Sequence, residues 1–217
     1  MNFELARNNM VTQQIRPWDV LDDDVLKVMA TLPREWFVPS EFQALAYTDT
    51  DIPLGEGQTL LPPKVVGRAL QAMGFTGTEK VLEIGTGSGY MTACLSKLAH
   101  SVVSMEIHES LLQTARTQLA RLDCQNVTLL HQDGVLGTPE HAPFDVIMVT
   151  GSYPLGVPEA LCQQLKTNGR LFAICGQAPS MQAVKMARDQ NAYRLTTLFE
   201  TVVANLINVP QPEKFQF

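Results

Sequence analysis

The apolar residues of the chain change their spacing near residue 80. Downstream of that point, short and largely apolar runs predict strands, at residues 80–85, 101–107, 126–133, 144–151 and 169–176. Between several of these runs, apolar residues recur every three or four positions and predict helices, at residues 88–99, 111–122 and 158–166. Strands that alternate with helices form parallel βαβ units, and the right-handed crossover places helices on both faces of the sheet. We therefore expect a doubly wound, mostly parallel, Rossmann-like α/β sheet, with one or two closing strands within residues 195–210.

The first 78 residues follow a different pattern. An amphipathic stripe predicts a helix over residues 19–32, which Pro33 ends, and a second stripe predicts a helix over residues 65–73. Residues 33–63 are irregular and rich in proline and glycine, and a long structured loop in a compact domain often carries function. We expect residues 1–78 to be a helical and loop extension of a core at residues 79–217, the two forming one compact unit.

Composition and charge narrow the class of protein. The 217 residues are 45% hydrophobic, which is enough for a packed core, and 16 basic against 22 acidic residues give a net charge of −6. The acidic balance argues against a general nucleic-acid binder, and the sequence has no apolar run of the length or type of a membrane span or signal peptide. The cysteines and histidines lack the spacing of a metal site. We expect a cytoplasmic protein that binds neither nucleic acid, membrane nor metal.

The strongest local signal is a glycine-rich run, Val81-Leu-Glu-Ile-Gly-Thr-Gly-Ser-Gly-Tyr90, which follows a strand and opens a helix. Glycine lets a ligand approach the backbone closely. A nicotinamide dinucleotide site needs G-x-G-x-x-G, whereas Tyr90 stands where the third glycine belongs. A carboxylate at Glu83 disfavours a pyrophosphate but suits the cationic groups of S-adenosylmethionine. The run favours this methyl donor over a dinucleotide, and its candidate binding residues are Glu83, Gly85, Thr86, Gly87, Ser88, Gly89 and Tyr90.

Two acidic residues at or just after strand ends fit the remainder of such a nucleoside. Glu106, with Ile107 beside it, ends the second predicted strand, where a carboxylate can accept hydrogen bonds from both ribose hydroxyls. Asp133, followed by Gly134, comes after the third strand and can accept a hydrogen bond from the adenine amino group. The alternatives are a solvated strand-end acid for Glu106 and a turn-forming Asp-Gly pair at residues 133–134.

With these residues in place, the chain resembles a class I S-adenosylmethionine-dependent methyltransferase, and more narrowly the protein-L-isoaspartate O-methyltransferase family. The motifs that carry the resemblance are REWFVP (34–39), AYTDTDIPLGEGQT (46–59), VLEIGTGSGY (81–90), FDVIMVT (144–150) and VPEALCQQLKTNGRL (157–171). The chain departs from the family pattern at Leu61, where the family has a serine that helps to hold the reacting groups. It departs again at Gly151 and Ser152, where the family usually has two alanines.

The resemblance implies an enzyme that transfers a methyl group from S-adenosylmethionine to an isoaspartyl carboxylate in damaged proteins and releases S-adenosylhomocysteine. We also expect a monomer whose extension at residues 1–78 covers the acceptor pocket. The candidate catalytic residues are Asp49, Thr59 and Leu61, and Thr59 also lies beside the cofactor in the family. A carboxylate nucleophile is already ionised at neutral pH, so no general base is needed. Because Leu61 donates no hydrogen bond, two alternatives stay open: a methyltransferase of this fold with another acceptor, and a non-catalytic S-adenosylmethionine-binding protein.

Overall fold

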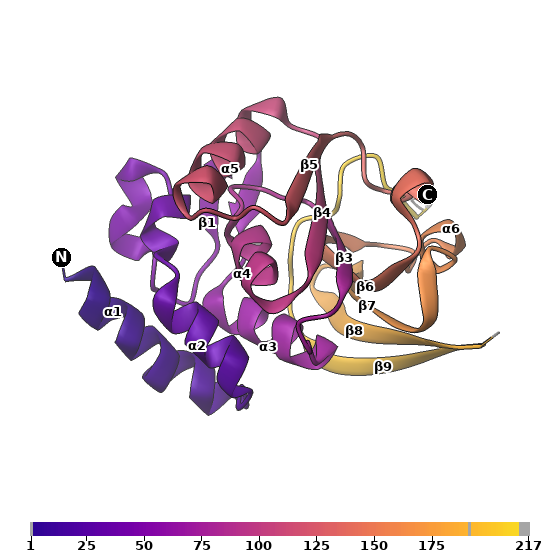
Figure 1. Cartoon of the computed structure of the whole chain (residues 1–217), viewed down its shortest axis with the longest axis horizontal. Coiled ribbons are helices and arrows are strands. Elements are labelled where there is room, and N and C mark those ends of the chain that lie inside the picture. Colours follow the sequence, from indigo (N-terminus) through magenta and orange to yellow (C-terminus); the bar gives the residue numbers. More distant parts are fainter. Residues whose placement is uncertain (1, 191, 213–217) are drawn as a thin grey trace, which may run out of the picture.

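The computed structural model describes residues 2–190 and 192–212 of the chain. The centre of this described part is a seven-stranded sheet with the strand order β5-β4-β3-β6-β7-β8-β9 (Figure 1). Its strands are β3 (Lys80–Ile84), β4 (Ser101–Glu106), β5 (Val127–His131), β6 (Phe144–Tyr153), β7 (Leu165–Gln177), β8 (Ser180–Asp189) and β9 (Ala192–Glu200). Neighbouring strands from β5 to β7 are parallel, and β8 and β9 extend the sheet in antiparallel fashion. The predicted α/β fold with a mostly parallel sheet is confirmed.

The C-terminal third differs in detail from the sequence prediction. The helix predicted over residues 158–166 is only α6 (Glu159–Cys162), because the chain turns and pairs with β6 from Leu165 onward. The side-chain amide of Gln164 donates to the carbonyl oxygens of Leu136 and Ala160 and so stabilises this turn. Strand β8 has no counterpart in the prediction, since polar and charged residues interrupt its alternation. Residues 201–210 were expected to continue a closing strand, but within the described chain they form only an isolated bridge from Asn205 to Ser152.

The N-terminal extension consists of helices and a small hairpin. Its helices are α1 (Phe3–Asn9), α2 (Asp23–Thr31) and α3 (Pro63–Met73), and its hairpin pairs β1 (Ile52–Gly55) with β2 (Gln58–Leu60). The helix predicted over residues 19–32 begins only at Asp23, because the Asp22 carboxylate caps it by accepting hydrogen bonds from the N–H groups of Asp24 and Val25. The chain between α1 and α2 continues through a π-helical turn, Met10–Ile15, and a 3₁₀ turn, Arg16–Trp18.

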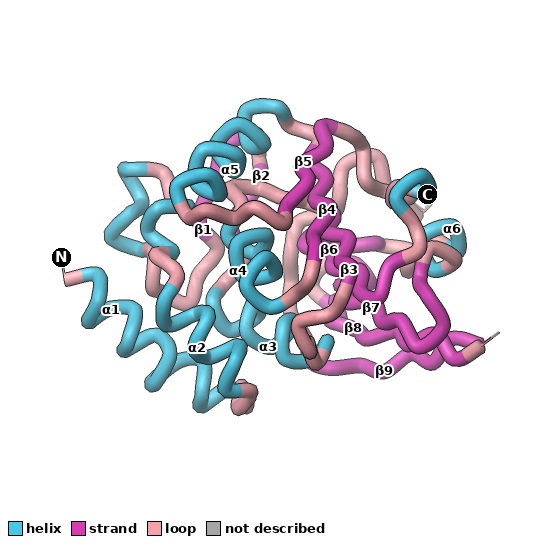
Figure 2. Tube along the Cα trace, in the orientation of Figure 1, coloured by secondary structure: helices cyan, strands magenta, loops and turns pink. Residues whose placement is uncertain are grey.

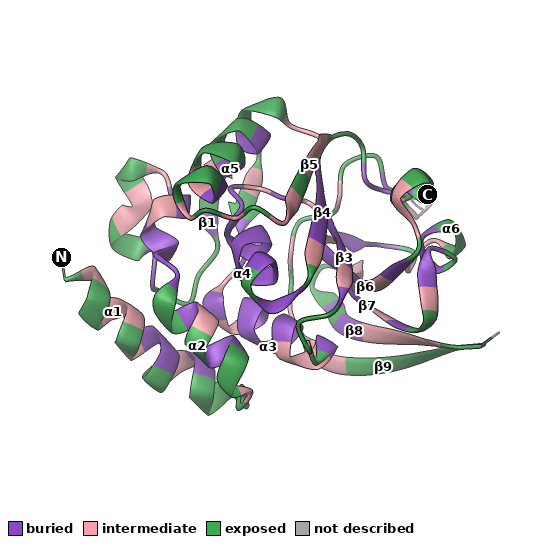
Figure 3. Cartoon of the chain, in the orientation of Figure 1, coloured by how far each residue is buried: buried purple, intermediate pink, exposed green. Residues whose placement is uncertain are grey.

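The sheet separates two apolar layers, because successive residues of each strand point to opposite faces. On β3, Val81 packs into the layer that contains α1 to α4 and part of α5, whereas Leu82 packs into the layer that contains α6. Helices α4 (Tyr90–Leu98) and α5 (Glu109–Arg121) complete the first layer, which Figure 2 shows gathered on one side of the sheet. This layer includes residues of both the extension and the sheet, so the two parts share one apolar core. Figure 3 shows the central strands buried and much of β9 exposed.

The strand order places a crevice at one edge of the sheet. Strand β3 lies between β4 and β6. The chain adds β4 and β5 on one side of β3 and then returns to add β6 and the later strands on the other side. In open α/β sheets, ligands bind at such a switch point, beyond the carboxyl ends of the strands. None of the described helices combines the length and the apolar character needed to cross a membrane.

Candidate active site

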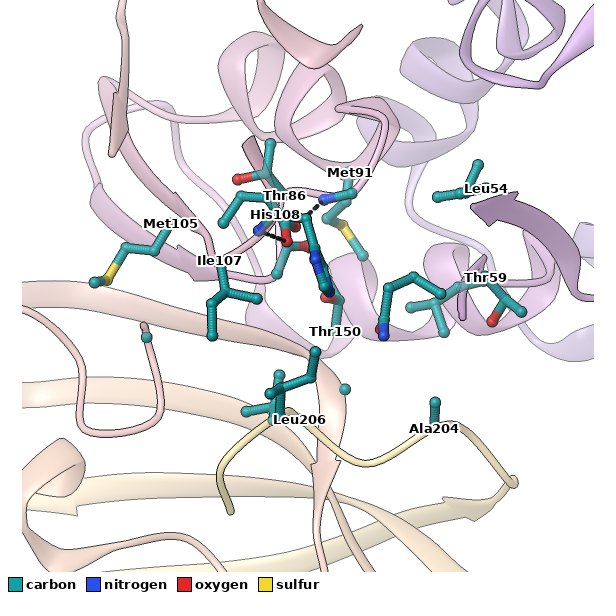
Figure 4. A pocket seen from close by; sticks show the side chains of 18 of the residues that line it. Leu54, Thr59, Thr86, Met91, Met105, Ile107, His108, Thr150, Ala204 and Leu206 are labelled. Carbon is teal, nitrogen blue, oxygen red and sulfur yellow. Dashed lines mark hydrogen bonds between the residues drawn. The ribbon is translucent and has the colours of Figure 1, made fainter. Parts of the chain in front are cut away.

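A pocket opens at the carboxyl ends of the central strands (Figure 4). One side is formed by the loop after β3 and by the ends of β4 and β5, and the other by β2, the end of β6 and residues 203–207. Most of the residues singled out from the sequence line it, namely Thr59, Leu61, Gly85, Thr86, Gly87, Ser88, Tyr90, Glu106, Ile107, Asp133 and Gly134. Asp49, Glu83 and Gly89 do not line it.

The glycine loop joins β3 to α4 and is tied to the neighbouring strand. The N–H groups of Gly85 and Thr86 both donate to the carbonyl oxygen of Met105 on β4, at 2.9 and 3.1 Å. Gly89 has a φ of +94° and begins α4, and a Cβ there would lie only 3.0 Å from the Cβ of Ala115 on α5. The structure therefore corrects the expectation for Gly89. It allows the turn and the close packing of α4 on α5, and it does not face the pocket.

Glu106 is held at the end of β4 by the loop itself. Its Oε2 accepts a hydrogen bond from the N–H of Gly87 at 2.8 Å, and its Oε1 accepts one from the N–H of His108 at 3.0 Å. The side chain is nearly buried but lines the pocket. A carboxylate has about four acceptor positions, so each oxygen can still accept a hydrogen bond from a ligand hydroxyl.

Asp133 is oriented in a similar way after β5. Its Oδ1 accepts from the N–H of Val135 at 2.9 Å, and its Oδ2 accepts from the side-chain amide of Asn208 at 2.8 Å. Gly134 lies against β3, since a Cβ there would come within 2.8 Å of Ile84 Cγ2. Asp133 and Gly134 therefore form a turn and also line the pocket.

Glu83 was expected to meet a cationic ligand, and the structure corrects this expectation. Its side chain points to the α4 face of the sheet, on the same side as Val81, and is fully buried. Its Oε2 accepts hydrogen bonds from the hydroxyls of Thr92 on α4 and Ser104 on β4, at 2.5 and 2.6 Å. Burial raises the pKa of Glu83 to about 8, although both hydroxyl hydrogen bonds lower it. Ser104 also shares a hydrogen bond with Thr86, so Glu83 stabilises the glycine loop through Ser104.

The acceptor side of the pocket contains Thr59 and Leu61 from the end of the hairpin. Leu61 is nearly buried, and its carbonyl oxygen accepts a hydrogen bond from the Arg34 guanidinium at 2.7 Å. Asp49 lies elsewhere, because its carboxylate pairs with Lys64 at 2.6 Å. The same ammonium lies 4.2 Å from the ring centroid of Trp18. Asp49 thus belongs to a surface ion pair outside the pocket lining.

Several lining residues were missed by sequence reasoning. They are Leu54 on β1, His108 after β4, Thr150 and Gly151 on β6, and residues 203–207 near the C-terminus. The Thr150 hydroxyl donates to the carbonyl oxygens of Ile84 and Gly85 and so joins β6 to the glycine loop. The departure from the family pattern at residues 151–152 was the available signal for residues 203–207, because Gly151 and Ser152 contact this segment.

A family model described as Protein-L-isoaspartate(D-aspartate) O-methyltransferase (PCMT) matches residues 5–210 of the chain. The chain belongs to this family. It is therefore an S-adenosylmethionine-dependent O-methyltransferase, and the predicted family and methyl donor are confirmed.

Individual members of the protein-L-isoaspartate O-methyltransferase family align along most of the chain. It is 40% identical to Protein-L-isoaspartate O-methyltransferase 2 of Pelobacter propionicus, with 87% of this chain and 84% of the relative covered. It is 40% identical to the Geobacter metallireducens enzyme, with 88% of each covered. A solved protein-L-isoaspartate O-methyltransferase superposes with a TM-score of 0.80 at 27% identity, over 92% of this chain and 65% of that one.

A Plasmodium falciparum protein assigned to the same family, and solved in complex with S-adenosyl-L-homocysteine, shares the fold. Its TM-score is 0.78 at 20% identity, over 95% of this chain and 98% of that one.

The pocket of this family member fits the methyl donor. Among the described residues, the hydroxyls of Ser88 and Tyr90 and the Nε2 atom of His108 are buried without a hydrogen-bond partner, and all three residues line the pocket. Unpaired buried polar atoms are rare in folded proteins, and a polar ligand can satisfy them. Glu106 and Asp133, which line the same pocket, add acceptor oxygens for the hydroxyl and amino groups of such a ligand.

Proposed function

We propose that the protein methylates isoaspartyl carboxylates in damaged proteins and acts in protein repair. The names of the aligned relatives and the family description support this acceptor. The observation that carries the proposal is the single pocket that joins Glu106 and Asp133 on one side to Thr59 and Leu61 on the other. Such a pocket can hold donor and acceptor next to each other, which is the main requirement for methyl transfer.

We assign the donor to the glycine-loop side of the pocket. Glu106 would accept hydrogen bonds from the ribose hydroxyls, Asp133 would accept one from the adenine amino group, and the Ser88 hydroxyl would donate to the donor's carboxylate. Bound S-adenosylmethionine supplies an electrophilic methyl group. The Ser88 hydroxyl, which lacks a partner among the described residues and belongs to the pocket lining, supports this assignment.

We assign the acceptor to the hairpin side, where the extension at residues 1–78 covers the core. An isoaspartyl carboxylate is ionised at neutral pH and needs no base, so the protein's task is to hold its oxygen in line with the methyl group. Thr59 can donate a hydrogen bond to this carboxylate, whereas Leu61 offers only an apolar surface. We further propose that the protein acts as a monomer in the cytoplasm.

Incubation with radiolabelled S-adenosylmethionine tests this function. An isoaspartyl peptide should accept label, and the same peptide with a normal aspartyl residue should not. If neither peptide accepts label but another acceptor does, the acceptor proposal is wrong. The apolar side chain of Leu61 favours this second candidate, a methyltransferase of the same fold with another acceptor. If S-adenosylhomocysteine binds and no acceptor is labelled, the protein binds the cofactor without turnover.

A further inference from the structure

The chain after β9 lines one wall of the pocket. We call residues 203–208 the C-terminal strap. Residues 203–207 line the pocket, and Figure 4 shows Ala204 and Leu206 beneath Thr150 on a segment far from β6 in the sequence. The strap is not part of a strand, so its position depends on a small number of specific contacts.

Ser152 on β6 holds the middle of the strap. Its N–H donates to the carbonyl oxygen of Ala204 at 3.0 Å, and its own carbonyl oxygen accepts from the N–H of Leu206 at 3.1 Å. Its hydroxyl donates to Oδ1 of Asn205 at 2.7 Å. Ser152 is fully buried, whereas Ala204 and Asn205 on the strap are exposed, so the bonds join a buried strand position to a surface segment.

Gly151 makes the close approach of the strap possible. A Cβ at this position would lie 2.7 Å from Leu206 Cδ2, 3.0 Å from its Cγ and 3.2 Å from its backbone nitrogen. Even the smallest side chain would therefore push Leu206 outward. The chain has glycine and serine at two adjacent positions, one to admit the strap and the other to bind it.

The two ends of the strap reach opposite sides of the pocket. Val203 and Ala204 line the pocket that also contains Thr59 and Leu61 of the hairpin. Asn208, at the other end, donates to Oδ2 of Asp133 at 2.8 Å, while Oδ1 of the same carboxylate accepts from the N–H of Val135. Displacing the middle of the strap would thus alter the acceptor side and the orientation of Asp133 together.

We propose that Gly151 and Ser152 are positioning residues for methyl transfer, which act by holding the C-terminal strap as a wall of the pocket. The effect on acceptor binding rests on the isoaspartyl function proposed above. The strap itself can be tested without an acceptor, since the N–H of Leu206 reports on its contact with Ser152.

The first experiment compares Gly151→Ala, Leu206→Ala and the double variant. Gly151→Ala should raise the KM for an isoaspartyl peptide about tenfold, with kcat within about threefold, because overpacking displaces the strap. Adding Leu206→Ala removes the clashing side chain. The KM of the double variant should therefore lie within about threefold of the KM of Leu206→Ala alone. Such a non-additive effect is expected of residues in contact. Val202→Ala is the control, because Val202 precedes the strap, is exposed and lies outside the pocket lining.

The second experiment measures hydrogen exchange across residues 203–208 with S-adenosylhomocysteine present. Ser152→Ala and Gly151→Ala should each speed exchange at the Leu206 amide at least about fivefold, as expected of local opening. Unchanged exchange in both variants would overturn the strap assignment, as would additive KM effects in the double variant. If the wild-type protein methylates no isoaspartyl peptide, the proposed acceptor is wrong. The hydrogen-exchange measurement would then still test whether Gly151 and Ser152 hold the strap.

Discussion

The guanidinium of Arg34 donates a hydrogen bond to the carbonyl oxygen of Leu61 at 2.7 Å, and its Nε donates to the carbonyl oxygen of Ala46 at the same distance. Arg34 is fully buried, and no carboxylate of the described chain pairs with it. Its planar group lies instead 4.7 Å from the ring centroid of Tyr90, a pocket residue. One side chain therefore fixes both ends of the hairpin segment and connects it to the cofactor loop.

Replacing Arg34 should destabilise the fold strongly. Arg34→Met leaves two buried carbonyl oxygens without donors, and each such loss costs about 1–3 kcal/mol, so we expect the free energy of unfolding to fall by about 2–5 kcal/mol. Urea denaturation measures this change. Arg68→Met is the control, because Arg68 also donates to two carbonyl oxygens but at the surface, and it should cost less than about 1 kcal/mol. Equal losses in the two variants would contradict the role given to Arg34.

Glu106 should account for a large part of cofactor affinity. Glu106→Ala removes the acceptor of two backbone N–H groups and of the expected ribose hydroxyls, so binding of S-adenosylhomocysteine should weaken by about 1–3 kcal/mol. Isothermal titration calorimetry measures the Kd. Glu109→Ala provides the control, since Glu109 is exposed and pairs with His131 outside the pocket. An affinity that Glu106→Ala leaves unchanged would remove Glu106 from the site.

Leu61→Ser should improve methylation of an isoaspartyl peptide. A hydroxyl at this position can donate to the acceptor carboxylate, and a net gain of about 0.5–1.5 kcal/mol corresponds to about a two- to tenfold rise in kcat/KM. The assay is initial-rate methylation of the isoaspartyl peptide. Leu61→Ala is the matched control, because it removes the same apolar atoms without adding a donor. If both variants raise the rate equally, the gain comes from space in the pocket and not from a hydrogen bond.

The buried Glu83 predicts a characteristic dependence of stability on pH. Its pKa of about 8 lies above that of an unfolded glutamate, so between about pH 5 and pH 8 the folded protein keeps a proton that the unfolded chain has lost. The free energy of unfolding should therefore fall as the pH rises through this range, by up to about 1.4 kcal/mol per pH unit. Glu83→Gln should flatten this decline in denaturation series measured from pH 5 to pH 9.

Glu79 is a control for Glu83, because its pKa is shifted in the opposite direction. Burial alone would raise its pKa, but hydrogen bonds from Arg170 and Thr76 lower it below its usual value. Its contribution to stability is therefore present above the pKa of an unfolded glutamate and is lost only as the pH falls through the lowered folded pKa. Glu79→Gln should leave the decline between pH 5 and pH 8 intact. A decline that persists in Glu83→Gln would show that other groups cause it.

The sequence by itself determined the parallel core of this protein. The apolar runs that form β3 to β7 and the glycine run before α4 are local patterns, and they place Glu106 at the end of one strand and Asp133 just beyond the end of the next. The family followed from motifs within single segments. The local patterns did not predict that α6 is short or that β8 forms, because strand pairing with β6 and β7 outweighed local propensity there.

Only the tertiary structure decided which side chains reach the pocket. Glu83 stands two residues before Gly85, yet the alternation of β3 directs its carboxylate into the buried layer beneath α4. Asp49 is drawn into an ion pair with Lys64, and Asn205 meets Ser152 across 53 residues of chain. Such contacts depend on how distant segments pack together, and that information is carried by no local spacing of residues.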